Sequence, residues 1–238
     1  MKNSIRFSRF CAVLFALLMP VVSGVRVFAD PAAGEQNTID VCVTMEKLTL
    51  GQGYIIEPTI VTVPEGTQAS VVITDLLKQR YPDTNPCYQI TGTETSGFYL
   101  AQVYDPDQRG ISIPDYIVQK LGGVDQEAIE ENAKDEWLGE FDYTGMSGWM
   151  YSTGMTDTFG DNKFPNVGAA DYPLNYSGEV IRWQFTLYGY GADLGADNSE
   201  WGEESIVEST DKDALIWTVA RLRSEKTEEE LAEIDAYK

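Results

Sequence analysis

Histidine is absent from the whole 238-residue sequence. This absence excludes Ser-His-Asp and Cys-His catalytic pairs, histidine general bases and the common zinc sites that contain histidine. The sequence also has no phosphate-binding loop, dinucleotide-binding glycine motif or zinc-peptidase helix. A pair of carboxylates that cleaves a glycosidic bond needs no histidine, but the spacing of the 38 acidic residues singles out no such pair. We therefore expect a protein that is not an enzyme.

Basic residues are scarce, with 17 Lys and Arg against 38 Asp and Glu. Four of the basic residues and none of the acidic ones lie in residues 1–29, so the rest of the chain carries a formal charge of about −25. Such a surface repels nucleic acid and anionic lipid, so neither is an expected partner. The charge keeps a secreted protein soluble, and calcium binding by some of the carboxylates is the alternative use.

Two acidic stretches have some features of a calcium-binding loop. Asp105–Gly110 begins like an EF-hand loop, but Arg109 stands at the fifth position and Tyr116 at the twelfth, where glutamate is needed. Residues 157–162 offer oxygen ligands at turn spacing, and such residues usually serve the turn itself. We expect no metal site in either stretch.

The N-terminal segment has the organisation of a secretory signal peptide. Three basic residues precede an apolar run from Phe10 to Val22, and Val27–Ala29 offers a small-residue cleavage site. The apolar run is short for a membrane span. We predict a signal peptide over residues 1–29, a flexible lead-in over residues 30–37, and a secreted or surface-associated protein with no membrane insertion after cleavage.

Two cysteines lie beyond the predicted signal peptide, Cys42 and Cys87. Export places them where a disulfide persists, and an isolated pair has one intramolecular connectivity. On the chain-entropy model, a disulfide closing this loop stabilises a fold by roughly 3 to 4 kcal/mol. We predict a disulfide between them, whereas an anaerobic environment would leave both thiols reduced.

Hydrophobic periodicity predicts an α+β fold. Residues 39–46 and 181–188 alternate between apolar and polar, as half-buried strands do. Residues 54–63 continue in extended form, and Pro58 within them indicates an edge or a bend. Apolar residues from Ala69 to Leu77 recur at helical spacing, which predicts a helix that packs on the sheet. Two strands followed by a packed helix begin a β-grasp-like arrangement.

Beyond Gly195 the chain changes character. It starts with an acidic loop, after which Ser209 or Thr210 is expected to cap a helix. Thr227–Glu230 is a capping box that opens a last short helix. We expect residues 196–238 to form an acidic loop and a helical tail, which either packs on the domain or leads towards a partner.

Three motifs give the chain a resemblance to a known family. They are Ser147-Gly148-Trp149-Met150-Tyr151, then Pro165-Asn166-Val167-Gly168 with Asp171-Tyr172, and Val180-Ile181-Arg182-Trp183 with Thr186. In these motifs the chain resembles the C-terminal domain of transcobalamin and intrinsic factor, and more closely the bacterial cell-surface domains of unknown function related to it. The resemblance implies one domain over residues 38–195, with a small β-grasp-like mixed or antiparallel sheet and a packed helix. In the animal carriers this domain closes over cobalamin beside a large helical domain.

Aromatic residues are the best candidates for ligand binding. Those in segments that the fold is expected to bring together are Tyr54, Trp149, Tyr151, Tyr172 and Tyr188. Stacked rings suit a flat ligand, a sugar or the side chains of a partner. The resemblance implies that Trp149 and the loop from Asn166 to Tyr172, Asp171 included, lie near the ligand-facing side. The alternative for each ring is packing in the core, which we expect for Trp183.

Two hypotheses about function follow. The first is a non-enzymatic binding module for a small molecule such as cobalamin or another corrinoid. The second is a structural or adhesion module that meets a surface protein or a glycan through the same aromatic residues. No other cofactor is expected in either case.

Overall fold

The computed structural model describes residues 26–27, 37–108, 110–123, 127, 136–155, 164–196 and 204–235. The strands are β1 (Arg26–Val27), β2 (Thr38–Glu46), β3 (Tyr54–Pro64), β4 (Tyr88–Thr93), β5 (Ser96–Tyr104), β6 (Trp137–Gly139), β7 (Gly148–Met155) and β8 (Glu179–Thr186). The α-helices are α1 (Ala69–Arg80), α2 (Asp115–Leu121), α4 (Asp213–Ser224) and α5 (Glu228–Asp235), and 3-10 helices cover Leu48–Leu50, Ala169–Asp171 and Gly189–Leu194. Apart from β1 and Asn37, the predicted signal peptide and lead-in lie outside the described residues, as does the whole stretch 157–162 weighed for calcium.

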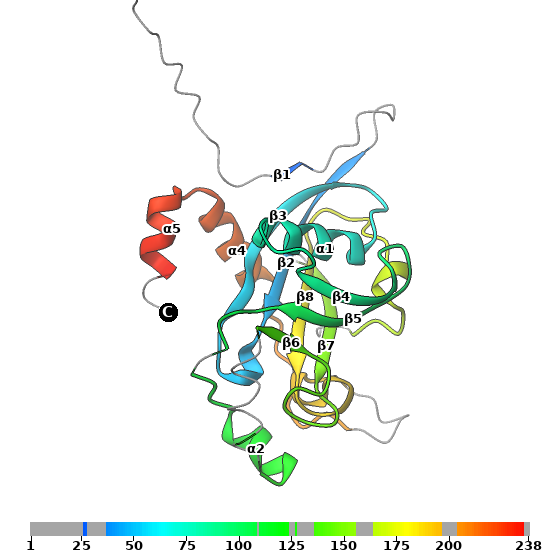
Figure 1. Cartoon of the computed structure of the whole chain (residues 1–238). Helices are drawn as coiled ribbons and strands as arrows, with labels where there is room; N and C mark the ends of the chain where they lie inside the picture. Colours follow the sequence, from blue (N-terminus) through cyan, green and yellow to red (C-terminus); the bar gives the residue numbers. More distant parts are fainter. Residues whose placement is uncertain are drawn as a thin grey trace, which may run out of the picture.

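The strands form two sheets, so the fold is mixed α+β (Figure 1). The larger sheet has the order β1-β3-β2-β8-β7, and the smaller one has the order β4-β5-β6. In the larger sheet β2 is antiparallel to β3 and parallel to β8, and β7 is antiparallel to β8. The strands predicted from alternation at 39–46 and 181–188 are confirmed as the neighbouring strands β2 and β8.

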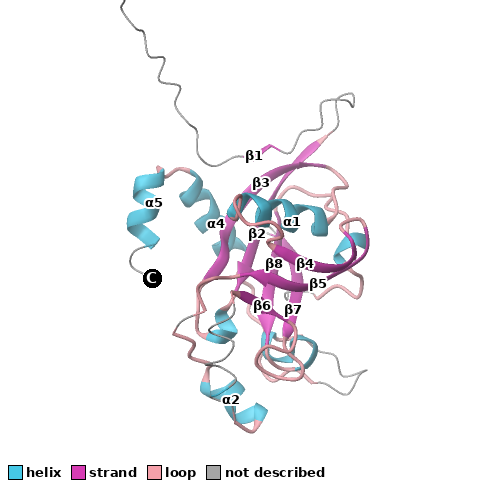
Figure 2. Ribbon diagram, in the orientation of Figure 1, coloured by secondary structure: helices cyan, strands magenta, loops and turns pink. Residues whose placement is uncertain are grey.

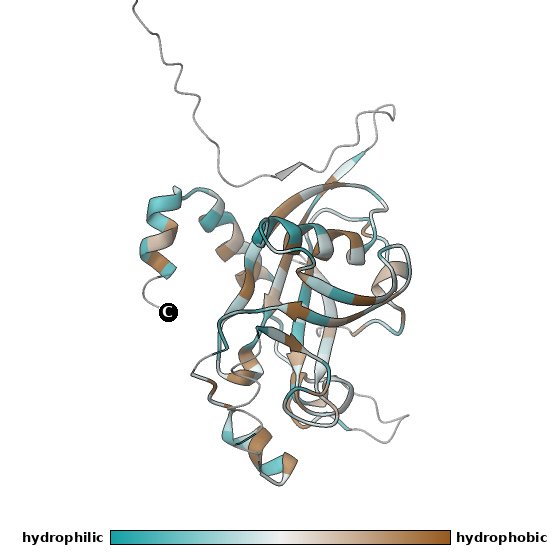
Figure 3. Ribbon diagram, in the orientation of Figure 1, coloured by the Kyte–Doolittle hydropathy of each residue, from teal (hydrophilic) through white to brown (hydrophobic). Residues whose placement is uncertain are grey.

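The five-stranded sheet lies between two layers (Figure 2). On one face, α1 and the three-stranded sheet bury the main hydrophobic core. On the other face, α4 packs on β3 and also contacts β2, β7 and β8. Helix α5 buries none of its residues and is largely hydrophilic (Figure 3). The helix that the sequence placed in a tail is therefore a layer of the fold, and α5 extends beyond it.

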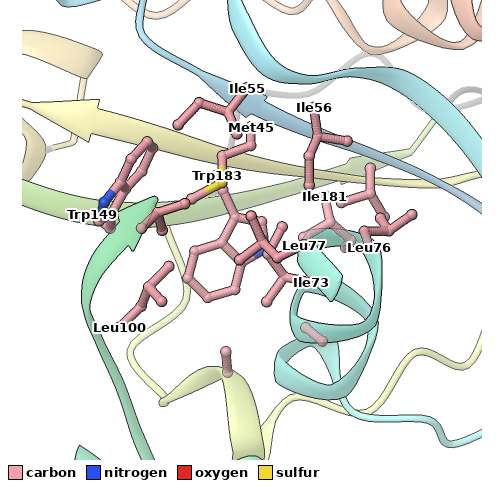
Figure 4. Packing of buried hydrophobic residues seen from close by; sticks show 14 of the residues in the cluster. Met45, Ile55, Ile56, Ile73, Leu76, Leu77, Leu100, Trp149, Ile181 and Trp183 are labelled. Carbon is pink, nitrogen blue, oxygen red and sulfur yellow. The ribbon is translucent and has the colours of Figure 1, made fainter. Parts of the chain in front are cut away.

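Trp183 of β8 lies at the centre of the main core, near Ile73 and Leu77 of α1 (Figure 4). Its ring stacks on Tyr151 with ring centroids 5.4 Å apart and meets the edge of Phe98 at 6.0 Å. Such pairs contribute roughly 0.5–1.5 kcal/mol beyond the area that they bury. The prediction that Trp183 packs in the core is confirmed.

Strand β8 departs from the sequence prediction in one respect, because all of its residues are buried. The polar residues Arg182 and Gln184 line a space beside the segment before α4, and Thr186 donates to Asp193 of the 3-10 segment, so none of the three faces solvent. A half-buried strand was expected because alternation alone does not tell a polar face in water from a polar face under a helix.

The helix ends agree in part with the sequence. The capping box is confirmed, since Thr227 N–H donates to Glu230 Oε2 at 2.9 Å and Glu230 N–H donates to Thr227 Oγ1 at 3.2 Å. The expected cap of α4 is wrong. Lys212 occupies the N-cap position, and Asp211 Oδ1 accepts the N–H of Asp213 at 2.9 Å.

Both described cysteines are buried free thiols. Cys42 packs on Val180 and Ile216 under α4, whereas Cys87 belongs to the main core on the opposite face of the sheet. Burial raises the pKa of the Cys42 thiol to about 12, so it is protonated and unreactive at neutral pH. The disulfide stays a prediction from the sequence, and the structure leads to the opposite expectation.

Thiol titration separates these two expectations. We expect the chain without residues 1–29 to show no reaction with a thiol reagent when native, because both thiols are buried, and two reactive thiols per chain after unfolding without reductant. Mass spectrometry after alkylation would assign them. A chain that shows no thiol until a reductant is added would establish the disulfide instead.

Candidate functional site

Trp149, the first residue expected to face a ligand, is part of the core. Its side chain is 7% exposed, and its indole N–H donates to the carbonyl of Leu138 at 3.0 Å. Its ring meets Phe185 edge to face at 5.2 Å. The core-packing alternative therefore describes Trp149 in this structure, because both its ring and its N–H have partners inside the protein.

Tyr151 and Tyr172 form a half-buried pair beside the core. Their ring centroids are 6.0 Å apart, and the Tyr151 hydroxyl donates to the carbonyl of Val167 at 2.7 Å. Burial raises the pKa of both hydroxyls, so both stay protonated at neutral pH. The pair fastens the loop that carries Asn166 and Asp171 to β7, and these two side chains are exposed.

The other two predicted residues lie elsewhere. Tyr54 lines a groove at the β3 edge, and the ring of Tyr188 lies 5.9 Å from the ammonium group of Lys120. The structure thus brings Tyr151, Tyr172 and the loop from Asn166 together, but it does not gather all seven predicted residues into one site.

A polar cavity of about 220 Å³ lies on the α4 face of the sheet. The segment 207–212, which leads into α4, forms one wall, and the sheet forms the floor. The cavity is lined by Glu46, Leu48, Thr49, Tyr116, Arg182, Gln184, Phe185, Asp193, Leu194, Val207, Glu208, Ser209, Thr210 and Lys212. Sequence reasoning missed this cavity, because its polar floor, Glu46, Arg182 and Gln184, comes from strand positions that were expected to face water.

The floor of the cavity is a buried ion pair between neighbouring parallel strands. Arg182 Nε donates to Glu46 Oε1 at 2.8 Å, and Arg182 Nη2 donates to Glu46 Oε2 at 2.7 Å. Both side chains are at most 5% exposed. Burial opposes the charged form of Arg182, but the hydrogen bonds and attraction from Glu46 outweigh it and raise the pKa of the guanidinium group. Both charges are therefore fixed in position.

Two polar groups on this floor are left for a ligand. The bonds to Glu46 use Nε and Nη2 of Arg182, and Nη1 makes no hydrogen bond with the described residues. The Nε2 of Gln184 donates to Ser152 Oγ at 2.9 Å, and its carbonyl oxygen makes no hydrogen bond within the described part of the chain. The cavity thus offers an N–H donor and a C=O acceptor, on two adjacent positions of β8's polar face.

The wall beside this floor is rigid for a separate reason. Asp193 is 3% exposed, and it accepts the hydroxyl of Thr186 and the backbone N–H of Leu187, the latter at 2.9 Å. Burial raises the pKa of this carboxyl despite those bonds. They tie the 3-10 segment Gly189–Leu194 to the end of β8 and hold the wall in place.

Asp213, the first residue of α4, is a buried carboxyl next to this ion pair. It lies over Gly154 of β7, where a Cβ atom would overlap its Oδ2, so the close approach requires glycine. The side chain is 1% exposed, and Oδ1 has no hydrogen-bond partner in the described residues. Burial and the neighbouring Asp211 raise the pKa of Asp213 to about 6, and attraction from Arg182 works against them.

The acidic residues weighed for calcium have other roles where the structure describes them. Asp105 Oδ2 forms a buried ion pair with Lys47 Nζ at 2.7 Å. Among the described residues, no three Cys, Asp or Glu side chains are grouped as a metal site would need. Within the same part of the chain, no helix has the length and apolar character required to cross a membrane.

A second hollow, an open groove of about 900 Å³, runs beside the first half of β3. Its lining consists of Lys47, Gly51, Gln52, Gly53, Tyr54, Ile55, Ile56, Glu57, Thr59, Leu76, Gln79, Arg80, Asp107, Gly110, Arg223 and Asp235. It is four times the volume of the polar cavity, and Tyr54 is the one predicted site residue that lines either hollow.

The buried carboxyl of Asp213 makes folding dependent on pH. The folded state holds this proton more tightly than the unfolded state, so the stability it contributes falls as pH rises from about 3.8 to about 6 and is constant above. We expect Asp213→Asn to raise the free energy of unfolding at pH 7 by about 2 kcal/mol, with no gain at pH 3.5. Urea unfolding at both pH values measures this difference. The exposed control Glu229→Gln should change neither value, and a destabilised D213N at pH 7 would contradict the assignment.

Comparison with known proteins adds no family to this geometry. A scan against models of protein families finds no match to the chain, and a search of curated proteins likewise finds none. The residues of the cavity and the strand order are therefore the grounds on which a function is proposed.

Proposed function

We propose that the protein is a secreted or surface-associated, non-enzymatic binding module whose ligand enters the polar cavity on the α4 face. One observation carries this proposal: Arg182 is buried and held by Glu46, yet it lines the cavity with one amino group unused. A buried ion pair is weak evidence for stability, because apolar residues of similar volume often stabilise a fold as well or better. A binding role accounts for a charge pair kept at this position.

The ligand group that fits the floor is a carboxamide. Its carbonyl oxygen accepts from Arg182 Nη1, and its N–H donates to the side-chain carbonyl of Gln184. A cavity of about 220 Å³ is smaller than the roughly 300–1,000 Å³ of sites that enclose a whole small molecule. An arm of a larger ligand therefore enters, while its body stays outside. Leu48 and Tyr116, which line the cavity and are 43% and 47% exposed, provide an apolar mouth for that body.

A corrinoid, the ligand that the transcobalamin resemblance implies, has this character. It is a flat macrocycle with peripheral carboxamide arms. The strand order supports a β-grasp-like fold as the resemblance implies, since the β2–β3 hairpin is followed by α1 and the late strand β8 runs parallel beside β2. Among the residues whose burial the structure describes, the buried hydrophobic ones lie between Ile39 and Ala220, so the chain without residues 1–29 keeps all of them.

Titration with cobalamin tests this proposal on the chain lacking residues 1–29. We expect saturable quenching of tryptophan fluorescence and a higher melting temperature at high ligand excess. Gln184→Ala removes the side-chain carbonyl that accepts from the ligand, and Tyr116→Ala removes an apolar ring at the mouth of the cavity. Each substitution should weaken binding at least tenfold. Tyr176→Ala, at a tyrosine that is 66% exposed and does not line the cavity, is the matched control and should bind normally.

Nicotinamide, a flat ring with one carboxamide, serves as a second probe in the same titration. If nicotinamide binds and cobalamin does not, the cavity is still a carboxamide site, but a corrinoid is not its ligand. If neither molecule gives a saturable change, the cavity is not a carboxamide site and the proposal fails.

The adhesion alternative has an observation of its own. Phe141 and Tyr190 are the non-glycine residues with positive φ in the described chain, at 68° and 51°, and their side chains are 64% and 62% exposed. A left-handed conformation costs a non-glycine residue roughly 1–2 kcal/mol. Strain of this kind, at exposed aromatic residues, gathers at binding surfaces. A neutral glycan fits such rings better than an anionic one, given the acidic chain.

The substitution Phe141→Gly removes the ring and leaves a residue that suits the backbone conformation at this position. Glycine adopts the left-handed conformation without strain, so the free energy of unfolding should stay level or rise by about 1 kcal/mol. Binding to immobilised neutral cell-wall glycans should nevertheless be lost, while Tyr176→Ala retains it. Unchanged glycan binding by F141G, or none by the unaltered protein, would refute the adhesion alternative.

A further inference from the structure

The edge of the five-stranded sheet at β3 is open along the first half of the strand. On one side β3 pairs with β2, and on the other side β1 pairs with Val61 and Thr62. Within the described residues, no strand pairs with the outer side of Tyr54–Ile60. Unpaired N–H and C=O groups on such an edge are a template for an added strand, and one group here is already used, since Thr59 Oγ1 donates to the carbonyl of Glu57 at 2.7 Å.

The groove of about 900 Å³ follows this open stretch. Leu76 and Arg80 of α1 border it from one face of the sheet, and Arg223 at the end of α4 borders it from the other. The two helices thus cover the faces of β3 and leave its edge between them. An extended peptide fits a groove of this form, because its backbone pairs with the strand while its side chains lie against the flanking helices.

Strand β1 shows how a segment sits on this edge. Arg26 lies opposite Val61 and Val27 opposite Thr62, and the two strands are parallel (Figure 1). This pairing begins two residues past Thr59, the last groove residue on β3. Because β1 belongs to the predicted signal peptide, cleavage after Ala29 would free this position and lengthen the open edge.

Charge selects the kind of segment that binds. The chain beyond residue 29 carries a formal charge of about −25, which attracts a basic partner. The groove lining itself is balanced, with Lys47, Arg80 and Arg223 against Glu57, Asp107 and Asp235, so the attraction comes from the rest of the chain. Lys47 is paired with Asp105, and Arg223 lies 3.3 Å from Asp235 and 3.9 Å from Glu57, so Arg80 is the remaining basic side chain of the lining.

We propose that the β3 edge accepts an extended, basic segment of a partner protein as an additional parallel strand. Arg26–Val27 holds the adjoining position until the leader is removed. Pro58 offers no N–H, and a register shift interrupts the β2–β3 ladder between Val43 and Met45, so added pairing forms on either side of this point. The site is distinct from the polar cavity and does not depend on its ligand.

Three labelled octapeptides test the proposal against the chain lacking residues 1–29. An alternating Arg-Val peptide has the charge and the extended backbone, and a Glu-Val peptide reverses the charge. An Arg-Pro peptide keeps the charge, but it has N–H groups on its arginines only and a polyproline II backbone that does not match a β-strand. In fluorescence anisotropy we expect saturable binding of Arg-Val, at least tenfold weaker binding of Glu-Val, and none of Arg-Pro. The full chain should bind Arg-Val more weakly, because β1 occupies part of the edge.

Hydrogen exchange measured by mass spectrometry locates the bound peptide. Arg-Val should slow exchange in β3 residues 54–62 and leave the strand at the opposite edge, β7, unchanged. Equal binding of Arg-Pro would show attraction by charge alone and would overturn the proposal. Protection at β7 or elsewhere, with β3 unaffected, would overturn it as well.

Discussion

The ion pair between Arg182 and Glu46 determines how one whole face of the sheet is covered. Each buried charge costs several kcal/mol in desolvation unless its partner is held in good geometry, and removing one partner typically costs roughly 3–5 kcal/mol. The parallel register of β2 and β8 supplies that geometry. It places Thr44 opposite Arg182, and Glu46 follows two residues later on β2, opposite Gln184. Thr44 Oγ1 also donates to Glu46 at 2.7 Å. The charges are satisfied within the sheet, so a helix can cover them.

That covering helix could not be assigned its place from the sequence. Alternation in 39–46 and 181–188 predicted the neighbouring strands β2 and β8, and the capping box predicted the start of α5, because these signals are local. The burial of Arg182 and Gln184 depends on α4, which follows more than twenty residues later and packs across the sheet. The residue pattern of a strand with a polar face is the same whether water or a helix covers that face.

The aromatic residues show the same limit of sequence reasoning, since rings that were expected to face a ligand pack inside the protein. Trp149 and Tyr151 share a face of β7, and the sequence does not say whether that face is inward. In the fold it is, because Trp149 donates to the Leu138 carbonyl of the smaller sheet and Tyr151 stacks on Trp183. The candidate site is therefore polar, whereas the sequence favoured rings. One signal was available: a charged residue, Arg182, between the large apolar residues Ile181 and Trp183 of a predicted strand requires a partner if it is buried.

Helix α4 joins the two hollows of the molecule. The segment before its N-terminus borders the polar cavity through Lys212, and Arg223 near its C-terminus borders the groove at the β3 edge. Its twelve residues form a rod of roughly 18 Å, so a ligand that orders one end can act on the other only by moving the helix as a body or by fraying an end. Asp213 is buried over Gly154 at the cavity end of the helix, and one of its oxygens has no hydrogen bond among the described residues, which costs stability there. The pKa of this carboxyl is raised to about 6, so it is charged at neutral pH, and its burial there lowers the stability of the folded chain.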